Sequence, residues 1–442
     1  MSSGGDSASI VVTDVRTDGR RVEYDYRPSP GVRRFFGEDL AVEYDVDVSE
    51  VPESLLVIPL VANLCPVAWA TGADVYVPKI DGTFLRALTE VRKGFERLHP
   101  EFAEEATVYA KEIVENATDS SRADARSGLL FSGGVDSVAS YVRHRDEDPL
   151  LVSIHGFDIP ADATDQWAER RAELRQFSDD RGLDHRFVRM NMQSSLNLVM
   201  LNAHFGRFYD DNWITSVHHG LGLLGACAPL AEVEDIGTLY IAATHSAEFD
   251  HEWGSHPVTD NEVAWADTAV EHDAYEWTRQ QKLYRIAEYV WNEAPNLRLR
   301  TCSAVAGNCS RCEKCARTGA GLLLAGLDPA NHGYDFDGRT LEYVREQFEA
   351  GNWHLGADER FMWRDIQNHA DPEREYPYPE AEDFFRWLRN ADIDALAVRS
   401  TNADSTDSVR NRALYAVARH TPAGVYSPLY SAYSYLDERL SG

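Results

Sequence analysis

The sequence predicts an α/β protein built on a parallel sheet of five strands with helices on both faces, preceded by an α+β module and followed by a helical extension. In the middle of the chain, short apolar runs of strand length alternate with longer stretches of helical periodicity, which is typical of a parallel sheet. Before this region short alternating runs predict strands, and after it only helical stretches follow. The predicted parts are residues 9–118, 125–326 and 328–442.

The first part combines strands and helices. Alternating runs at residues 9–15, 21–28 and 41–48 predict strands, and the apolar stretch 51–72 predicts a buried helix. An amphipathic helix ending at Pro100 follows, and a polar linker at 119–126 leads into the second part. We find no catalytic constellation in the first part.

The second part carries the predicted parallel sheet. Its five strands are expected at residues 129–131, 150–157, 186–192, 239–243 and 297–301, with helices at 163–181, 217–231, 276–290 and 313–324. Such sheets bind their ligands at the carboxyl ends of the strands. The loop after each strand is therefore a candidate ligand-binding segment.

A glycine-rich turn joins the first of these strands to a helix. It consists of Ser132, Gly133, Gly134, Val135, Asp136 and Ser137, and we refer to these six residues as the glycine turn. Adjacent glycines allow the main chain to approach a ligand closely, and the unpaired amides at the start of the helix favour an anion. The turn has neither the spacing nor the lysine of a Walker A loop. The alternative is a helix that Ser132 or Asp136 merely caps.

Candidate ligand-binding residues lie at the ends of two other predicted strands or directly after them. His155 and Phe157 end the second strand and are expected beside a bound cofactor. The loop after the fourth strand supplies candidates for binding an acceptor substrate or Mg²⁺, namely His245, Ser246, Glu248, Asp250, Ser255, His256 and Asp260. The rival interpretation is a solvated acidic loop.

Arg279 and Lys282 lie three residues apart, on one face of a predicted helix. Lysine is rare in this chain, so its position beside an arginine suggests a phosphate-binding pair rather than a chance surface pair. A surface charge pair stays open as the alternative.

Four cysteines occur close together, at Cys302, Cys309, Cys312 and Cys315. The spacing C-x6-C-x2-C-x2-C can enclose a tetrahedral Zn²⁺ that is closed to substrate and therefore structural. An iron–sulfur cluster is the rival, although the x3-C-P continuation of ferredoxins is absent.

The chain is strongly acidic. Its 73 acidic and 43 basic residues leave a net charge of −30, and only five of the basic residues are lysine. This composition resembles cytosolic proteins of salt-loving organisms, in which bulk salt screens the self-repulsion. It argues against broad nucleic-acid binding. The N-terminus has neither the basic region nor the apolar core of a signal peptide, and no window approaches eighteen uninterrupted apolar residues, so we expect a soluble, cytoplasmic protein.

The SGGVDS sequence of the glycine turn resembles the SGGxDS loop of the PP-loop ATP pyrophosphatases, whose domain has the HUP variant of the Rossmann-like fold. The cysteines that follow, in the same order, resemble those of 7-cyano-7-deazaguanine synthase-like proteins. Thr244 and Ser246 stand where that group has Gly and Asn in a GxNxxD segment, and the acid, Asp250, is displaced by one position.

The resemblance implies an ATP- and Mg²⁺-dependent carbon–nitrogen ligase. Such an enzyme adenylates a carboxylate or amide, releases pyrophosphate, and lets ammonia or an amine displace AMP. In this scheme Ser132, Asp136, Arg279 and Lys282 carry catalysis through positioning and charge neutralisation. The partner is a small-molecule acceptor, and the first part holds that acceptor, covers the nucleotide site or forms a homodimer.

Two other functions stay open at this stage. One is sulfur insertion into tRNA, which requires a basic RNA-binding surface and a catalytic cysteine free of metal. The other is a nucleotide-binding protein without turnover. Formation of AMP and pyrophosphate with candidate acceptors separates an enzyme from the latter.

Overall fold

The structure is a computed structural model of the 442-residue chain. It describes residues 8–117, 125–302 and 307–397, and also 413, 415–422, 424–426, 428 and 429. The predicted linker at 119–126 lies almost wholly outside the described residues. Of the helical extension predicted over 328–442, most residues after 397 also lie outside the described residues.

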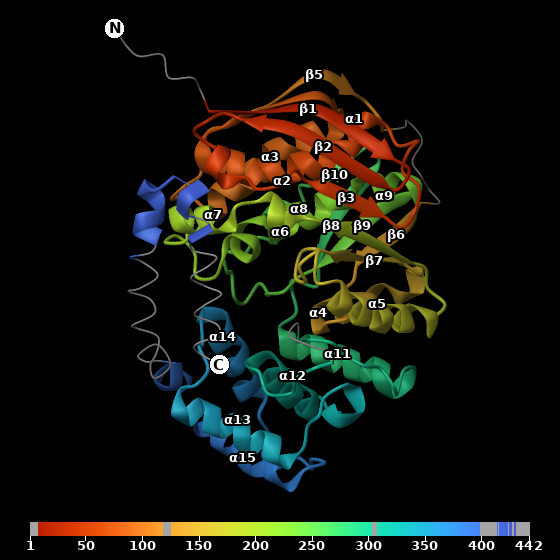
Figure 1. The fold of residues 1–442 in the computed structure, drawn as a ribbon. Helices are drawn as coiled ribbons and strands as arrows, with labels where there is room; N and C mark the ends of the chain where they lie inside the picture. The colour runs from red at the N-terminus through yellow and green to blue at the C-terminus, as the bar shows by residue number, and fades with distance from the viewer. Residues whose placement is uncertain are drawn as a thin grey trace.

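One mixed sheet of 11 strands runs through the molecule in the order β10-β11-β9-β6-β7-β8-β3-β2-β1-β4-β5 (Figure 1). The α/β class is confirmed, but the predicted five-stranded parallel sheet is wrong, because strands of the first part extend the central ones. The joint is an antiparallel pair between β3 and β8, in which Val42 lies opposite Met190. The added strands are β1 (Ser9–Asp18), β2 (Arg21–Pro28), β3 (Ala41–Tyr44), β4 (Asp74–Asp81) and β5 (Val108–Val114).

Five neighbouring strands within this sheet are mutually parallel, in the order β11-β9-β6-β7-β8. Their bounds are β6 (Arg126–Leu130), β7 (Leu150–His155), β8 (His185–Met190), β9 (Ile236–Ala242) and β11 (Thr268–Asp273), and β10 (Ala264–Trp265) forms a hairpin with β11.

The fifth parallel strand is not the predicted one. Residues 297–301 form no strand; Leu297 and Leu299 are buried in a helical core, and the Arg300 amide donates to the Gly133 carbonyl (2.8 Å). The true fifth strand, β11, ends with the polar residues Glu271, His272 and Asp273, and these made it look like part of a polar stretch of sequence.

The order of the parallel strands fixes where a ligand can bind. Numbered along the chain, they lie as third, second, first, fourth and fifth. The first strand, β6, therefore neighbours the fourth, β9, and the connections leave these two strands toward opposite sides of the sheet. In open α/β sheets the crevice at the carboxyl ends of such a pair is the usual ligand site.

Two hydrophobic cores lie on opposite faces of the parallel strands, because successive side chains of a strand alternate between faces. Leu130 and Leu150 belong to one core, whereas Leu129 and Leu151 belong to the other. The first core contains side chains of α1, α2, α3, α6, α7, α8 and α9, and the second those of α4, α5, α11, α12, α13, α14 and α15. The packing thus crosses the boundaries predicted between the three parts, and that division stays a prediction.

Helices of the first core are α1 (Glu53–Leu56), α2 (Ile58–Thr71), α3 (Gly82–Leu98), α6 (Met192–Ser195), α7 (Leu198–Phe205), α8 (His219–Ala226) and α9 (Ala228–Val233), with a π-helical turn at Ile214–His218. Helix α10 (Pro257–Asp260) packs against α3 and β11. Helices of the second are α4 (Val135–His144), α5 (Thr164–Asp179), α11 (Arg279–Asn292), α12 (Glu313–Leu324), α13 (Gly338–Ala350), α14 (Ala357–His369) and α15 (Pro379–Asn390). Short 3₁₀ turns lie at Arg33–Phe35, Arg145–Glu147 and Pro329–His332.

The apolar stretch predicted as a buried helix is α1 with α2. Among the described residues, Glu53–Thr71 is the one helical stretch long and apolar enough to cross a membrane, and 94% of its most apolar window is buried inside the protein. Here it serves as a core helix.

The C-terminal extension packs α13 and α15 together at the end of the molecule opposite β1 and β5 (Figure 1). Among its described aromatic residues, Phe348, Trp363 and Phe385 are almost fully buried core residues. Helix α14 was not predicted as a separate helix, although Met362, Trp363 and Ile366 have helical spacing.

Helix α8 approaches α2 so closely that a Cβ on Gly225 would lie 2.2 Å from the Ala62 Cβ. We expect Gly225→Ala to lower the free energy of unfolding by about 1–3 kcal/mol, since the helices must separate to accept the methyl group. Denaturant unfolding at constant salt measures the change. The control is Gly31→Ala, where nothing lies within 4 Å of an added Cβ; its effect should stay within about 0.5 kcal/mol. Equal effects would contradict this packing.

Candidate functional site

The glycine turn follows β6 at the switch point of the sheet. Gly133 has φ +74°, a left-handed conformation that favours glycine. Gly134 is the N-cap of α4, and no side chain caps this helix, so the capping role suggested for Ser132 or Asp136 is not observed. Inside the turn the Ser132 amide donates to Ser137 Oγ (3.2 Å), and the two hydroxyl oxygens are also 3.2 Å apart. The first amides of α4 remain available to an anion.

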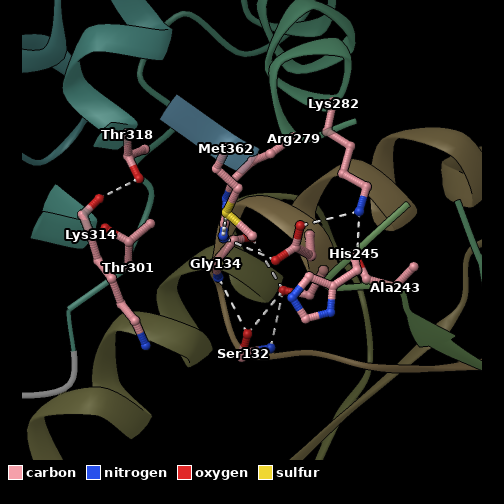
Figure 2. Close-up of polar contacts among 12 residues, drawn as sticks. Ser132, Gly134, Ala243, His245, Arg279, Lys282, Thr301, Lys314, Thr318 and Met362 are labelled. Carbon is pink, nitrogen blue, oxygen red and sulfur yellow. Dashed lines mark hydrogen bonds and ion pairs between the residues drawn. The ribbon is translucent and has the colours of Figure 1, made fainter. Parts of the chain in front are cut away.

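Asp136 accepts from both predicted cations of α11. Arg279 Nη2 donates to one carboxylate oxygen (3.0 Å) and Lys282 Nζ to the other (3.2 Å) (Figure 2). Lys282 also donates to the Ala243 carbonyl at the end of β9, and its side chain is only 1% exposed. Lys282 is thus buried at the turn and Arg279 is half-buried there, and the surface-pair interpretation does not hold for Lys282.

Burial and charge act against each other in this triad. Burial lowers the pKa of Lys282, although Asp136 opposes the shift. For Asp136 burial works to raise the pKa, but the charges of Arg279 and Lys282 outweigh it and the pKa is lowered. The carboxylate is therefore ionised at neutral pH and fixes both cations beside the turn.

Arg170 and Arg300 also contact the glycine turn, and the sequence did not predict either contact. Arg170 of α5 donates to the Ser132 carbonyl (3.3 Å) and the Cys302 carbonyl (3.2 Å). Burial and the nearby charge of Arg300 lower the pKa of Arg170 to about 10, so it is a cation at pH 7. Arg170 belongs to an arginine-rich helix and carries no motif, so nothing in the sequence singled it out.

The predicted cofactor residues of the second strand lie inside the fold. His155 stacks on Trp167 with ring centroids 4.6 Å apart, and its Nε2 bonds the Pro160 carbonyl (2.9 Å). Phe157 is buried against His219. Among the described residues, neither makes a hydrogen bond or ring contact with the glycine turn.

The loop after β9 divides into two groups. His245 and Ser246 are buried directly after the strand, next to the turn; Figure 2 shows His245 close to Ala243. His245 Nε2 lies 4.0 Å from Asp358 Oδ2 of α14. Burial lowers the pKa of His245 despite that carboxylate, so the imidazole is neutral at pH 7.

The second group makes hydrogen bonds within the loop and with β11 and the residues that follow it. Asp250 bonds His256 (2.8 Å), and Ser255 donates to Asp260 (2.6 Å), whose carboxylate also contacts His272 (2.9 Å). These contacts hold α10 in place against α3 and β11. The structure therefore brings His245 and Ser246 to the turn but gives Asp250, Ser255 and His256 a role in holding the loop.

Helix α14 covers the site from the C-terminal extension. Phe361 stacks on Phe249 with ring centroids 4.8 Å apart. Met362 Sδ accepts from Arg279 Nη1 (3.7 Å) (Figure 2), and Asp358 faces His245. The extension thus forms one wall of the site, and the residues missed with α14 are those that face the turn.

The four predicted cysteines converge. Their sulfur atoms all lie within 4.8 Å of one another, with Cys309 Sγ 3.9 Å from Cys315 Sγ and Cys312 Sγ 4.0 Å from Cys302 Sγ. A tetrahedron of Zn–S bonds of about 2.3 Å places sulfurs at similar separations. The cluster can hold a metal such as zinc.

Several features preorganise this cluster. The Asn308 side chain accepts from the amides of Thr301 (2.9 Å) and Cys302 (3.2 Å) and donates to the carbonyls of Leu299 (2.8 Å) and Gly333 (2.9 Å). A hydrogen bond from Cys315 lowers the pKa of Cys312 to about 5, which favours a thiolate there.

Comparison of the chain with protein-family models, curated proteins and solved structures found no match. The fold and site define an α/β protein with a glycine turn at the switch point of its parallel strands, cations around that turn, and a four-cysteine cluster behind it.

The triad predicts a measurable coupling. Asp136→Asn leaves Lys282 buried beside Arg279 without its counter-ion and should cost about 3–5 kcal/mol of unfolding free energy. Lys282→Met in the same chain should recover part of that loss, because the unpaired charge is gone. Denaturant unfolding of both single variants and the double variant gives the coupling energy. Strictly additive effects would contradict the pairing.

Metal content tests the cysteine cluster. Cys312→Ser should abolish stoichiometric metal binding and lower the melting temperature, whereas Cys227→Ser, in the apolar core, should retain the metal. Elemental analysis of protein purified without added metal provides the measurement. Metal retained in full by the Cys312 variant would exclude the cluster as the site. Absorbance near 400 nm would indicate an iron–sulfur cluster instead.

Proposed function

We propose that this protein is an ATP-dependent adenylating enzyme of the PP-loop type. It would form AMP and pyrophosphate while activating a carboxylate or amide for attack by ammonia or an amine. The observation that carries the proposal is the gathering of cations around the glycine turn in a chain of net charge −30. A polyanion bound over the turn explains why Arg170, Arg279 and Lys282 lie buried or half-buried there.

The chemistry follows from where the charges lie. With ATP bound over the turn, an acceptor oxygen attacks the α-phosphorus, and the bond to the bridging oxygen of pyrophosphate breaks. The turn amides, Arg279 and Lys282 neutralise the charge that develops on the leaving pyrophosphate. Asp136 holds both cations before the substrate arrives, so no reorganisation is required. A nitrogen nucleophile then displaces AMP from the adenylate.

Mg²⁺, when bound with the nucleotide, would supply further charge neutralisation at the phosphates. Asp136 is the acidic residue of the turn, but its two cation contacts favour an orienting role. The acceptor would lie on the side of His245 and Ser246, beneath α14.

We assign zinc to the four cysteines in a structural role. All four sulfurs take part in the cluster, which leaves no protein ligand position open for substrate. Arg170 bonds carbonyls of both Cys302 and Ser132, so an ordered cluster supports the glycine turn.

Insertion of sulfur into tRNA is the less supported alternative. It requires a reactive thiol, and the two cysteines outside the cluster, Cys65 and Cys227, are fully buried. Burial raises the pKa of both thiols, that of Cys227 to about 12. A nucleotide-binding protein without turnover is the other alternative, and detection of AMP formed from ATP would exclude it.

The remaining expectations stay predictions. They are a small-molecule acceptor, a cytoplasmic location in a salt-loving cell, and either acceptor binding, cover of the site or homodimer formation by the first part of the chain. Because β3 pairs with β8, the first part continues the sheet that carries the glycine turn, and this favours a role in holding the site in place.

Ser132→Ala should reduce release of pyrophosphate from ATP at least about 100-fold, because the turn loses a hydroxyl that faces the phosphates. Pyrophosphate is measured by a coupled assay, with extracts of the native organism as the source of acceptor. Ser49→Ala, a substitution at an exposed distant serine, serves as the control and should leave the rate unchanged. The same loss is expected for Asp136→Ala, and unchanged release in both site variants would refute the scheme.

A further inference from the structure

Two arginines from neighbouring helices converge on the sulfur of Met362. Arg279 of α11 donates from Nη1 to Sδ (3.7 Å), and Arg317 of α12 donates to the same sulfur from its own Nη1. Met362 is 5% exposed and Arg317 is 3% exposed. Figure 2 shows Met362 beside Arg279, close to the glycine turn.

A thioether is a poor partner for two guanidinium groups, of which that of Arg317 is buried and that of Arg279 is only 17% exposed. Its sulfur accepts hydrogen bonds only weakly, whereas a buried cation needs strong acceptors to offset its loss of water. Arg317 has one carboxylate partner, Glu313, at Nε (3.1 Å). Arg279 has Asp136 at Nη2, while its buried Nε finds no acceptor among the described residues. The donors that face Met362, one Nη1 from each arginine, suit an oxyanion better than a thioether, because guanidinium groups bind carboxylate and phosphate oxygens strongly.

The nearby acids do not exclude an anion. Burial, together with Asp358 and Glu313, raises the pKa of Glu359 to about 8, so this side chain is neutral at pH 7. Asp358 faces His245, and Glu313 is held by Arg317 and by the Trp363 indole (2.7 Å).

We infer that Arg279 and Arg317 form an oxyanion subsite next to the glycine turn, and that the Met362 side chain fills it until a carboxylate or phosphate group enters. The inference rests on the proposed function, since it assigns this subsite to an anionic group of the same reaction. Only a side-chain rotation is needed, because methionine is unbranched and has flexible torsions. Two sources share the chemistry, namely the carboxylate of the acceptor and a phosphate of the nucleotide.

Titration calorimetry on the full chain, at one fixed concentration of KCl, tests the subsite with two probes, benzoate and inorganic pyrophosphate. Met362→Ala should tighten binding of the probe that enters the subsite by on the order of tenfold, because the thioether no longer has to be displaced. Met362→Leu is the matched control; it keeps the space filled and should bind as the parent does. Arg317→Gln should weaken binding and cancel the gain of Met362→Ala in the double variant.

The probe that responds identifies the source: benzoate indicates the acceptor carboxylate, and pyrophosphate indicates the nucleotide. The subsite is overturned if neither probe responds to Met362→Ala or Arg317→Gln. Should Arg317→Gln fail to fold, Arg317→Lys keeps the charge without the fork and should still weaken binding, and the comparison of Met362→Ala with Met362→Leu stands alone. Failure of the proposed function is distinct: Ser132→Ala would then leave pyrophosphate binding unchanged, whatever the Met362 and Arg317 variants do.

Discussion

The buried pairing of Asp136 with Arg279 and Lys282 is the interaction on which the site depends. It ties α4, which begins in the glycine turn, to α11, which follows the last parallel strand, and the second bond of Lys282 adds the end of β9. Taking a lysine out of water is costly, and one carboxylate shared by two cations leaves a net positive charge in the protein interior. An anionic ligand over the turn would complete the balance.

The rest of the structure keeps these charges in place. The sheet sets β6 beside β9, so that the glycine turn and Ala243 lie at the same edge. Arg170 connects the four-cysteine cluster to the glycine turn, because it donates to the carbonyls of Cys302 and Ser132. Helix α14 of the C-terminal extension covers the site with Phe361 and Met362. The extension is therefore part of the site.

The sequence was most informative where chemistry or periodicity is local. Two adjacent glycines before a helix located the turn, and the cysteine spacing located the cluster. A rare lysine three residues from an arginine located the cation pair. Long-range packing could not be anticipated in the same way. Strand β3 pairs with β8 across about 140 intervening residues. Strand β11 has polar residues in its second half and therefore did not stand out as a strand. Arg170 contacts the turn because the fold brings α5 next to it, and no local sequence signal indicates this contact. Helix α14 had readable spacing, but nothing local linked it to a site more than 200 residues earlier.

The central claim is that ATP is cleaved between its α and β phosphates at the glycine turn. Phosphorus NMR of ATP incubated with the protein, Mg²⁺ and an acceptor-containing extract fraction freed of other proteins identifies the products directly. The account predicts AMP and pyrophosphate in equal amounts, in proportion to the acceptor consumed. Formation of ADP and phosphate, or ATP left intact with every fraction, would contradict it.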